Sequence, residues 1–412
     1  MRKIGNLAAL LVLLLFALSG HTETHGAHSR FVHAEGKFLV DAGGHKLLLR
    51  GTNLGNWLVQ EGYMFHFDSG PQSVREIEAL TDQMIGPVAA ESFWKSYRAG
   101  YVTRKDIDFL AHEGFNAIRI PFHYRFFTPG NEEGFALVDQ VVAWAKADGL
   151  YVVLDMHAAP CGQTGANIDD SWGYPWLYDS KECQQQTFDI WKRIAAHYRD
   201  NSTVLGYDML NEPIPHYPRL AQYNSKLEPV YRGIVAAIRT VDTHHVVILG
   251  GAQWDTNFTV FSKPFDGNAM YTFHKYWMPP VQAQIQAYLD FRDKYNVPIW
   301  MSESGENKDE WITEFRTLLD RNEVSWTFWP YKKMNSTSAL VSFDRPAHWD
   351  EIVAFAAHKY TMGDTEKADA ARPSQEEIDA AFQDLLVKIR FENAHPNPGY
   401  LKALGAAADP AP

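Results

Sequence analysis

Short apolar segments that end in polar side chains recur along the chain. Residues 204–213, VLGYDMLNEP, lead with few breaks into Asn211 and Glu212, and a proline then stops the strand. Residues 297–305, VPIWMSESG, run in the same way into Glu303. A short apolar segment followed at once by a carboxylate is typical of a buried parallel strand with its functional groups at the carboxyl end.

The same pattern predicts eight strands and the helices between them. We expect strands at 48–53, 117–120, 151–155, 204–212, 246–249, 269–273, 297–302 and 324–329. Segments of helical period are expected at 103–112, 135–148, 184–199, 220–241, 282–294, 308–321 and 375–391. This alternation predicts an α/β fold, a closed (β/α)8 TIM barrel in which each strand is paired with a helix.

The segments around the barrel strands differ from this alternation. Residues 37–50 are predicted to form a β-hairpin that caps the bottom of the barrel, with FLV and KLLLR as strands and DAGG as the turn. Residues 61–100 are predicted to be a polar excursion with short helices. The tail from Pro373 is predicted to be a C-terminal helical extension. With no linker or repeat between these parts, residues 36–412 are predicted to form a single domain.

The first 19 residues have the pattern of a secretory signal peptide. Arg2 and Lys3 precede an apolar stretch, and Ala17-Leu18-Ser19 provides a small-x-small cleavage site. Residues 20–35, rich in His, Thr and Gly, are expected to be a disordered lead-in. We therefore expect a secreted or periplasmic protein.

Composition narrows the possible partners. The net charge of the 412-residue chain is −12 at pH 7, and loss of the two basic residues of the signal peptide would make it −14, which argues against nucleic acid and anionic membranes. Aromatic residues make up 14% of the chain, and their faces can stack on sugar rings, although most of the Trp are expected in the core. No other apolar segment is long enough to span a bilayer, and a monomer is expected.

Residues 156–183 are predicted to form a long loop rich in aromatic side chains. Both cysteines, Cys161 and Cys183, lie in it. Secretion would allow them to form a disulfide that holds the loop, and two free thiols are the alternative.

Glu212 and Glu303 are the candidate catalytic pair. The carboxyl ends of barrel strands meet at one face, so these two acids can face each other across the barrel mouth. Two carboxylates that flank one bond are what hydrolysis of a glycosidic bond requires. The alternative is that each Glu is a surface loop residue, which the matched strand-end positions disfavour.

Seven motifs in chain order carry a resemblance to a known family. They are GTNLGNW (51–57), AIRIPF (117–122), LDMHAAP (154–160), LNEP (210–213), FHKYW (273–277), SESG (302–305) and WTFWPYK (326–332). From about residue 36 to about residue 405, the chain resembles glycoside hydrolase family 5, the cellulase family of retaining β-glycosidases.

The resemblance implies roles for individual residues. Glu212 matches the family's acid/base and Glu303 its nucleophile. Glu212 should then have a raised pKa, while Glu303 should stay ionised with Arg119 as the neighbouring cation. Tyr276 matches a tyrosine that donates to the nucleophile, and Trp329 matches the aromatic platform under the reacting sugar.

Further residues are candidates for binding the substrate. Asn211 precedes the acid and can hydrogen-bond a sugar 2-hydroxyl. His274 lies two residues before Tyr276, so both can point the same way. His157 follows the third strand, where a satisfied buried histidine is the alternative. Sugar stacking or plain packing is expected for Trp57, Trp172, Trp176 and Trp277.

No metal or cofactor is expected. Asn167, Asp169 and Asp170 could be read as calcium ligands, but a solvated turn explains them better. A metal-dependent barrel hydrolase would need a His-x-His or HExxH cluster, which the chain lacks.

The predicted function is a secreted, retaining glycoside hydrolase that cleaves β-glucosidic bonds in a β-glucan or its oligosaccharides. A β-mannanase or another β-glycosidase of the same family is the alternative. A non-catalytic carbohydrate-binding barrel is the alternative of another class, which the presence of both acids disfavours.

Overall fold

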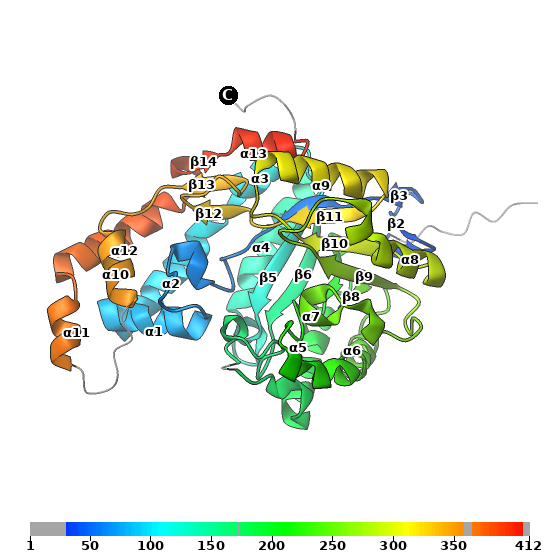
Figure 1. Ribbon diagram of the computed structural model, residues 1–412, viewed down its shortest axis with the longest axis horizontal. Helices are drawn as coiled ribbons and strands as arrows, with labels where there is room; N and C mark the ends of the chain where they lie inside the picture. Colours follow the sequence, from blue (N-terminus) through cyan, green and yellow to red (C-terminus); the bar gives the residue numbers. More distant parts are fainter. Residues whose placement is uncertain (1–29, 172, 358–364, 407–412) are drawn as a thin grey trace, which may run out of the picture.

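The computed structural model describes residues 30–357 without Trp172, and residues 365–406 (Figure 1). The predicted signal peptide, residues 1–19, and residues 20–29 of the predicted lead-in lie outside the described residues. The prediction of a disordered lead-in is wrong for residues 30–35, because Phe31 and Val32 are buried and β1 (His33–Glu35) is a strand. This segment is ordered because β1 pairs with the predicted hairpin and Phe31 stacks on His244 with 4.7 Å between ring centroids.

Eight parallel strands form a closed barrel, which confirms the predicted (β/α)8 architecture. Around the barrel the order is β10-β11-β4-β5-β6-β7-β8-β9. The strands are β4 (Arg50–Asn53), β5 (Ala117–His123), β6 (Tyr151–Ala158), β7 (Val204–Asp208), β8 (Val246–Gly250), β9 (Ala269–His274), β10 (Ile299–Glu303) and β11 (Ser325–Phe328).

The surrounding helices follow the predicted alternation with one exception. Those next to the barrel are α3 (Arg104–His112), α4 (Glu133–Asp148), α5 (Lys181–Tyr198), α6 (Asn224–Arg239), α8 (Gln286–Tyr295) and α9 (Asp309–Arg321). The prediction of a helix beside every strand is wrong after β8, where α7 (Ala252–Asp255) is a four-residue turn. Gln253 and Trp254 within it have left-handed backbones. A right-handed α-helix cannot contain such residues, so a full helix cannot form here. In the described part of the chain no helix is long and apolar enough to cross a membrane.

A three-stranded antiparallel sheet closes the amino ends of the barrel strands. It consists of β1, β2 (Phe38–Val40) and β3 (Lys46–Leu47). Val32 and Leu39 pack in one buried cluster with Leu49, Met270 and Trp300, which lie at or near the starts of β4, β9 and β10. The predicted hairpin is therefore present, with β1 as an additional strand.

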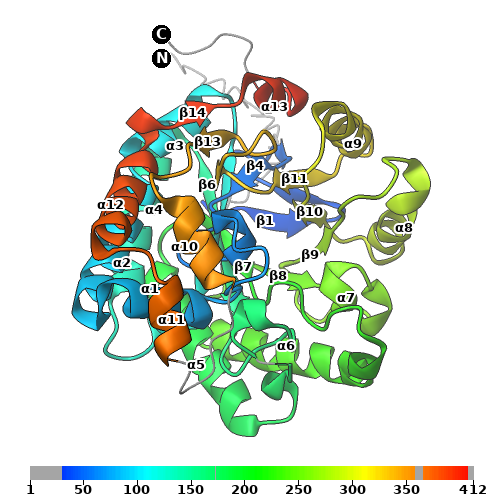
Figure 2. The same cartoon turned by 60° about the vertical axis from the view of Figure 1, so that its left-hand side comes forward.

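A second unit lies on one side of the barrel. The predicted excursion contains two full helices, α1 (Val74–Ile85) and α2 (Pro87–Tyr101), and both contact α12 (Gln375–Lys388) of the tail. Figures 1 and 2 show α10 (Trp349–Ala356) and α11 (Thr365–Ala371) beside them. The tail also contributes β14 (His395–Pro396) to a small sheet with β12 (Lys332–Met334) and β13 (Val341–Phe343), and it ends in α13 (Pro398–Ala403).

The side chain of Lys332 is fully buried and connects this second unit to the barrel. Its ammonium group donates to Asp106 Oδ1 at 2.6 Å, to the Tyr101 carbonyl at 2.8 Å and to the Ile389 carbonyl at 2.9 Å. Tyr331 also donates to Asp106, at 2.7 Å. One buried charge thus connects the ends of α2 and α12 to α3.

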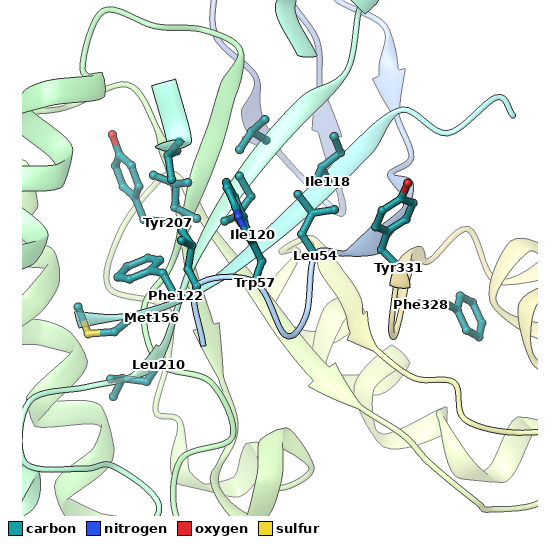
Figure 3. Packing of buried hydrophobic residues seen from close by; sticks show 14 of the residues in the cluster. Leu54, Trp57, Ile118, Ile120, Phe122, Met156, Tyr207, Leu210, Phe328 and Tyr331 are labelled. Carbon is teal, nitrogen blue, oxygen red and sulfur yellow. The ribbon is translucent and has the colours of Figure 1, made fainter. Parts of the chain in front are cut away.

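Apolar side chains fill the space between the barrel and its helices (Figure 3). Trp57 belongs to the same buried cluster as Leu54 and Ile120. Its indole is 1% exposed and donates to the Arg98 carbonyl at 2.8 Å. Trp57 is therefore a packing residue, which is the second of the two alternatives expected for it.

Candidate active site

The two candidate acids meet at the carboxyl end of the barrel. Glu303 is the last residue of β10, whereas Glu212 comes four residues after the end of β7 at Asp208. Glu212 has a left-handed backbone with φ of 46°, and its N–H donates to Asp255 at 2.9 Å. This turn brings an oxygen of Glu212 within 4.8 Å of an oxygen of Glu303.

His274 lies between the two acids. It is the last residue of β9, and its Nδ1 lies 3.0 Å from Glu212 Oε1 and 3.1 Å from Glu303 Oε2. Its Nε2 lies 2.9 Å from the Ser302 hydroxyl and 3.4 Å from Asp255. Burial lowers the pKa of His274 to about 3, so the ring is neutral at neutral pH. A neutral ring at this place can hydrogen-bond an acid without adding a charge between the two.

Arg119 connects the candidate nucleophile to a buried polar network. Its guanidinium donates to Asp208 at 2.8 Å, Asn53 at 3.1 Å and Asn211 at 2.9 Å, and lies 3.1 Å from Asp155. It also lies 3.6 Å from Glu303. Arg119 is fully buried, so these contacts hold it rigidly beside the acid.

The pKa of both acids is raised, whereas the sequence predicts a raised pKa for Glu212 and an ionised Glu303. Burial raises the pKa of Glu303 to about 7, although the positive charge of Arg119 opposes this shift. Burial also raises the pKa of Glu212. Arg119 does not keep the pKa of Glu303 low because it shares its single charge with Asp155 and Asp208.

His157 forms the side of the site next to Glu61. Its Nδ1 lies 2.7 Å from Asp155, and its Nε2 lies 3.7 Å from Glu61 and 3.2 Å from the Asn211 amide. Although burial opposes the charge, Asp155 raises the pKa of His157 to about 10. Asn211 is 2% exposed and engages both Arg119 and His157. Asn211 therefore lies behind the acid/base candidate and braces it.

Trp329 forms an aromatic surface in the cleft. It stacks on His157 with 5.7 Å between ring centroids and 8° between planes, and it donates to the Tyr63 hydroxyl at 2.7 Å. Gly55 makes this position possible, because a Cβ there would lie 2.3 Å from the indole ring.

A cleft of about 660 Å³ contains the two acids. The predicted residues that line it are His157, Glu212, His274, Tyr276, Trp277, Glu303 and Trp329. The predictions missed Glu61, Tyr63, Ile168, His216, Trp254, Thr256, Lys275, Met278 and Glu306. Lys275 directly follows β9 and Glu306 comes soon after β10, so position after a strand end was the available signal for them. Glu61, Tyr63, Ile168 and His216 lie further along their loops, where the sequence carries no such signal.

Other candidates lie elsewhere. Trp176, in the turn at Trp176–Tyr178, is 54% exposed and packs on Tyr174 outside the residues that line the cleft. Trp172 and the Asn167 side chain lie outside the described residues. Asp169 accepts from the backbone N–H groups of Gln163 and Thr164, so its carboxylate is used within the loop. Asp170 accepts from Arg75 and lies 3.0 Å from His123, which leaves no shared calcium site for the two acids.

A disulfide joins Cys161 to Cys183 across the long loop. The Gln163 side chain also anchors this loop, because its amide donates to the carbonyls of His157 and Asn211 at 2.8 and 2.9 Å. Ile168 from the same loop lines the cleft. The disulfide thus restrains a segment that shapes the site.

Among the described residues, Glu212, His274 and Glu303 also form a group whose donor atoms could hold a metal ion. Arg119 already places a positive charge 3.6 Å from Glu303, which opposes a second cation there. The trio fits proton transfer better than metal binding.

Comparison with known proteins gives a consistent assignment. A family model described as Cellulase (glycosyl hydrolase family 5) matches residues 81–335, more than half of the chain. A β-xylosidase of Phanerodontia chrysosporium is 28% identical over 88% of this chain and 82% of its own length. Endoglucanase C of Acetivibrio thermocellus is 22% identical over 65% of this chain and 94% of its own length.

A relative that matches a shorter part of the chain and two solved structures are consistent with this assignment. A probable glucan 1,3-β-glucosidase A of Aspergillus niger is 30% identical over half of this chain and 49% of its own length. Among solved structures, an endogalactoceramidase gives a TM-score of 0.56 at 20% identity, covering 74% of this chain and 75% of that one. AoRut gives 0.55 at 19% identity, covering 69% and 89%. At these identities the structural matches establish the fold alone.

Proposed function

The chain belongs to glycosyl hydrolase family 5, and from this premise we propose that it is a secreted, retaining β-glycosidase with Glu303 as nucleophile and Glu212 as acid/base. The separation of the two carboxylates carries the proposal. Retaining glycosidases hold their carboxyl groups about 5–5.5 Å apart, whereas inverting enzymes need about 6.5–9.5 Å to admit a water molecule. An oxygen-to-oxygen distance within 4.8 Å supports the retaining geometry.

The surroundings of each acid suit its proposed step. Glu303 attacks the anomeric carbon while Glu212 donates its proton to the leaving oxygen, and the glycosidic bond breaks. Glu212 then takes a proton from water, which displaces Glu303 from the glycosyl-enzyme. Arg119 stabilises the ionised nucleophile, and neutral His274 lies within hydrogen-bond distance of both acids without adding a charge between them.

For the substrate, we propose a β-glucoside in a β-glucan or its oligosaccharides. The β-glucosidase and endoglucanase names of two relatives support this sugar. The relative that covers most of this chain is named a β-xylosidase, so β-xylosides are the second candidate. Initial rates on aryl β-glucosides, β-xylosides and β-mannosides, followed by product analysis on the matching polysaccharides, separate these sugars.

Azide rescue tests the two catalytic roles. Glu303→Ala should lose at least about 10⁴-fold in kcat, and azide should restore turnover with an azide product of inverted configuration. Glu212→Ala should still cleave substrates with good leaving groups, and azide should then give a product of retained configuration. Glu314→Ala, a change at an exposed acid of α9 outside the cleft, is the matched control. An exchange of the two product configurations would contradict the assignment.

The N-terminal sequence supports export as part of the proposal, since residues 1–19 have the pattern of a signal peptide. N-terminal sequencing of the protein recovered from the medium and from the periplasm tests this. A chain that keeps Met1 and stays in the cytoplasm would contradict it.

A further inference from the structure

The walls of the cleft differ in polarity. One part contains Glu61, Tyr63 and Glu306, and Glu306 is paired with Lys333 at 2.6 Å. Ile168, Trp254, Trp277 and Met278 also line the cleft, and we call these four apolar residues the apolar wall. The first part offers carboxylates and a hydroxyl to a sugar, whereas the side chains of the apolar wall offer mainly carbon surface.

Trp254 of the apolar wall lies next to the acid/base candidate. The neighbouring residue, Asp255, accepts the Glu212 N–H at 2.9 Å, so the two turns are connected. The Trp254 ring packs edge-on against His216 at 5.2 Å and Tyr217 at 5.9 Å. Because the acid/base donates its proton to the leaving oxygen, the surface beside it must face the leaving group.

The backbone holds both tryptophans in place in an unusual conformation. Gln253, Trp254 and Asp255 have φ of 54°, 55° and 58°, and Trp277 has φ of 50°. Left-handed conformations at bulky residues cost about 1–3 kcal/mol each and persist only where surrounding contacts enforce them. Here the contacts include the Asn224–Gln253 amide pair and the Trp277 bond to the Glu306 carbonyl.

Trp277 remains exposed despite this cost. Its side chain is 72% exposed, and Tyr217, against Trp254, is 43% exposed. Ordered aromatic surface that the protein leaves uncovered is typical of a binding site. The strained loops therefore present apolar surface to a ligand rather than to the core.

The polar groups next to the apolar wall are already engaged. His216 Nε2 lies 3.2 Å from the Thr256 hydroxyl, and the Lys275 ammonium lies 5.4 Å from the centre of the Tyr288 ring. A sugar bound here would compete with these contacts for hydrogen bonds, whereas an aromatic group at Trp254 would leave them in place and lose little on leaving water.

We propose that the apolar wall binds the leaving group of the substrate and that this leaving group is an aromatic or other apolar aglycone rather than a further sugar. The proposal rests on the proposed function, since it names the leaving group of that reaction. Trp254 is its central residue, and Trp277 is the second tryptophan of the apolar wall. The preferred substrates are then β-glycosides of apolar alcohols or phenols.

Paired substrates test this proposal. The substrates share the glycone that gives the highest activity, and they carry 4-phenylphenyl, 4-(hydroxymethyl)phenyl or a second sugar as leaving group. The two phenols have similar acidity, so a difference between them reports binding rather than chemistry. The wild-type enzyme should show a kcat/KM at least about tenfold higher for the 4-phenylphenyl glycoside, as expected for burying one more ring.

The variants are Trp254→Ala, Trp277→Ala and the conservative Trp254→Phe. Each alanine variant should lose most of the preference, because its kcat/KM should fall several-fold more for the 4-phenylphenyl than for the hydroxymethyl substrate, and Trp254→Phe should keep the preference. Trp144→Ala is the matched control, since Trp144 is half-buried in α4, away from the cleft. Thermal unfolding checks that each variant is folded.

Three outcomes overturn the proposal: no wild-type preference, a preference for the second sugar, or equal losses on both phenols in the alanine variants. Since the wild-type comparison needs no substitution, unfolding of a variant cannot leave the proposal undecided. A failure of the proposed function looks different, because then no glycoside of any leaving group is cleaved and Glu303→Ala matches the wild type.

Discussion

The pKa of Glu303 is raised because its carboxylate is buried, although a cation, Arg119, lies beside it. Its carboxylate is buried at the end of a barrel strand, and Arg119 beside it also serves Asp208 and Asp155. With a pKa of about 7, Glu303, the proposed nucleophile, is ionised in only a fraction of the protein molecules at neutral pH. Protonation of Glu303 should therefore set the lower pH limit of activity.

This pKa predicts the pH profile. The ordinary pKa of a glutamate is 4.5 and that of Glu303 is raised to about 7, so kcat/KM should fall as the pH drops through about 7 and the nucleophile becomes protonated. The negative charge of Glu212 contributes to this rise. In Glu212→Gln, measured with an activated aryl glycoside that needs no acid, the acid limb should move to lower pH. Glu182→Gln, at an exposed position, should leave it unchanged, and an unshifted limb in Glu212→Gln would contradict the charge coupling.

At the scale of elements, the barrel strands could be predicted because they are buried on both sides. Apolar segments such as 151–155 and 246–249 carry this signal by themselves, and β6 and β8 lie there. In contrast, β1 has three residues and pairs with β2 across a turn. β14 has two residues and pairs with β13, which is distant in sequence. Such short strands have too few residues for a pattern to show.

The residues of the candidate site also divide into those that the sequence predicts and those that it does not. Glu212, Glu303 and Trp329 follow strands and match family motifs, so the sequence predicts their place in the cleft. The sequence leaves two alternatives for Trp57 and does not indicate Trp254, because tryptophans that stack on sugar and tryptophans that pack in the core do not differ in sequence. The left-handed turn at Trp254 depends on contacts with Asn224 and Glu212 that only the folded chain brings together.

The long loop after β6 gives a prediction at the scale of one element. The disulfide closes a separation of 22 residues, which is worth about 3 kcal/mol against the unfolded chain. Reduction should raise KM by about fivefold, equivalent to about 1 kcal/mol of lost contact at Ile168, while kcat stays within about twofold. The melting temperature should fall by only a few degrees, because Gln163 still anchors the loop.

Kinetics before and after reduction, with calorimetry on the same samples, measure both effects. The double variant Cys161→Ser/Cys183→Ser, treated with the same reductant, is the control and should not respond. An unchanged KM with a large drop in melting temperature would show that the disulfide stabilises the fold and not the loop.

For the whole molecule, the side unit depends on Lys332. Its ammonium group contacts the ends of α2 and α12 and pairs with Asp106 of α3 in a region without exposed surface. Removing one partner of a buried ion pair costs about 3–5 kcal/mol, because the other charge stays buried without compensation. Lys332→Met should therefore lower the free energy of unfolding by that amount, as measured by urea denaturation.

Lys95→Met is the matched control, since Lys95 pairs with Glu91 on the exposed face of α2. Exposed pairs of this kind contribute about 0.2–1 kcal/mol, so the control should lose less than 1 kcal/mol. Equal effects of the two substitutions would show that Lys332 does not hold the side unit to the barrel.

The sheet at the amino ends of the barrel strands has a practical consequence for attaching the enzyme to a solid support. Its turn at residues 41–45 is largely exposed and lies at the opposite end of the barrel from Glu303. Because Cys161 and Cys183 are joined, a cysteine introduced at the exposed Ala42 would provide the reactive thiol for coupling. An enzyme immobilised through that thiol would turn its cleft away from the support, toward a dissolved or insoluble polymer.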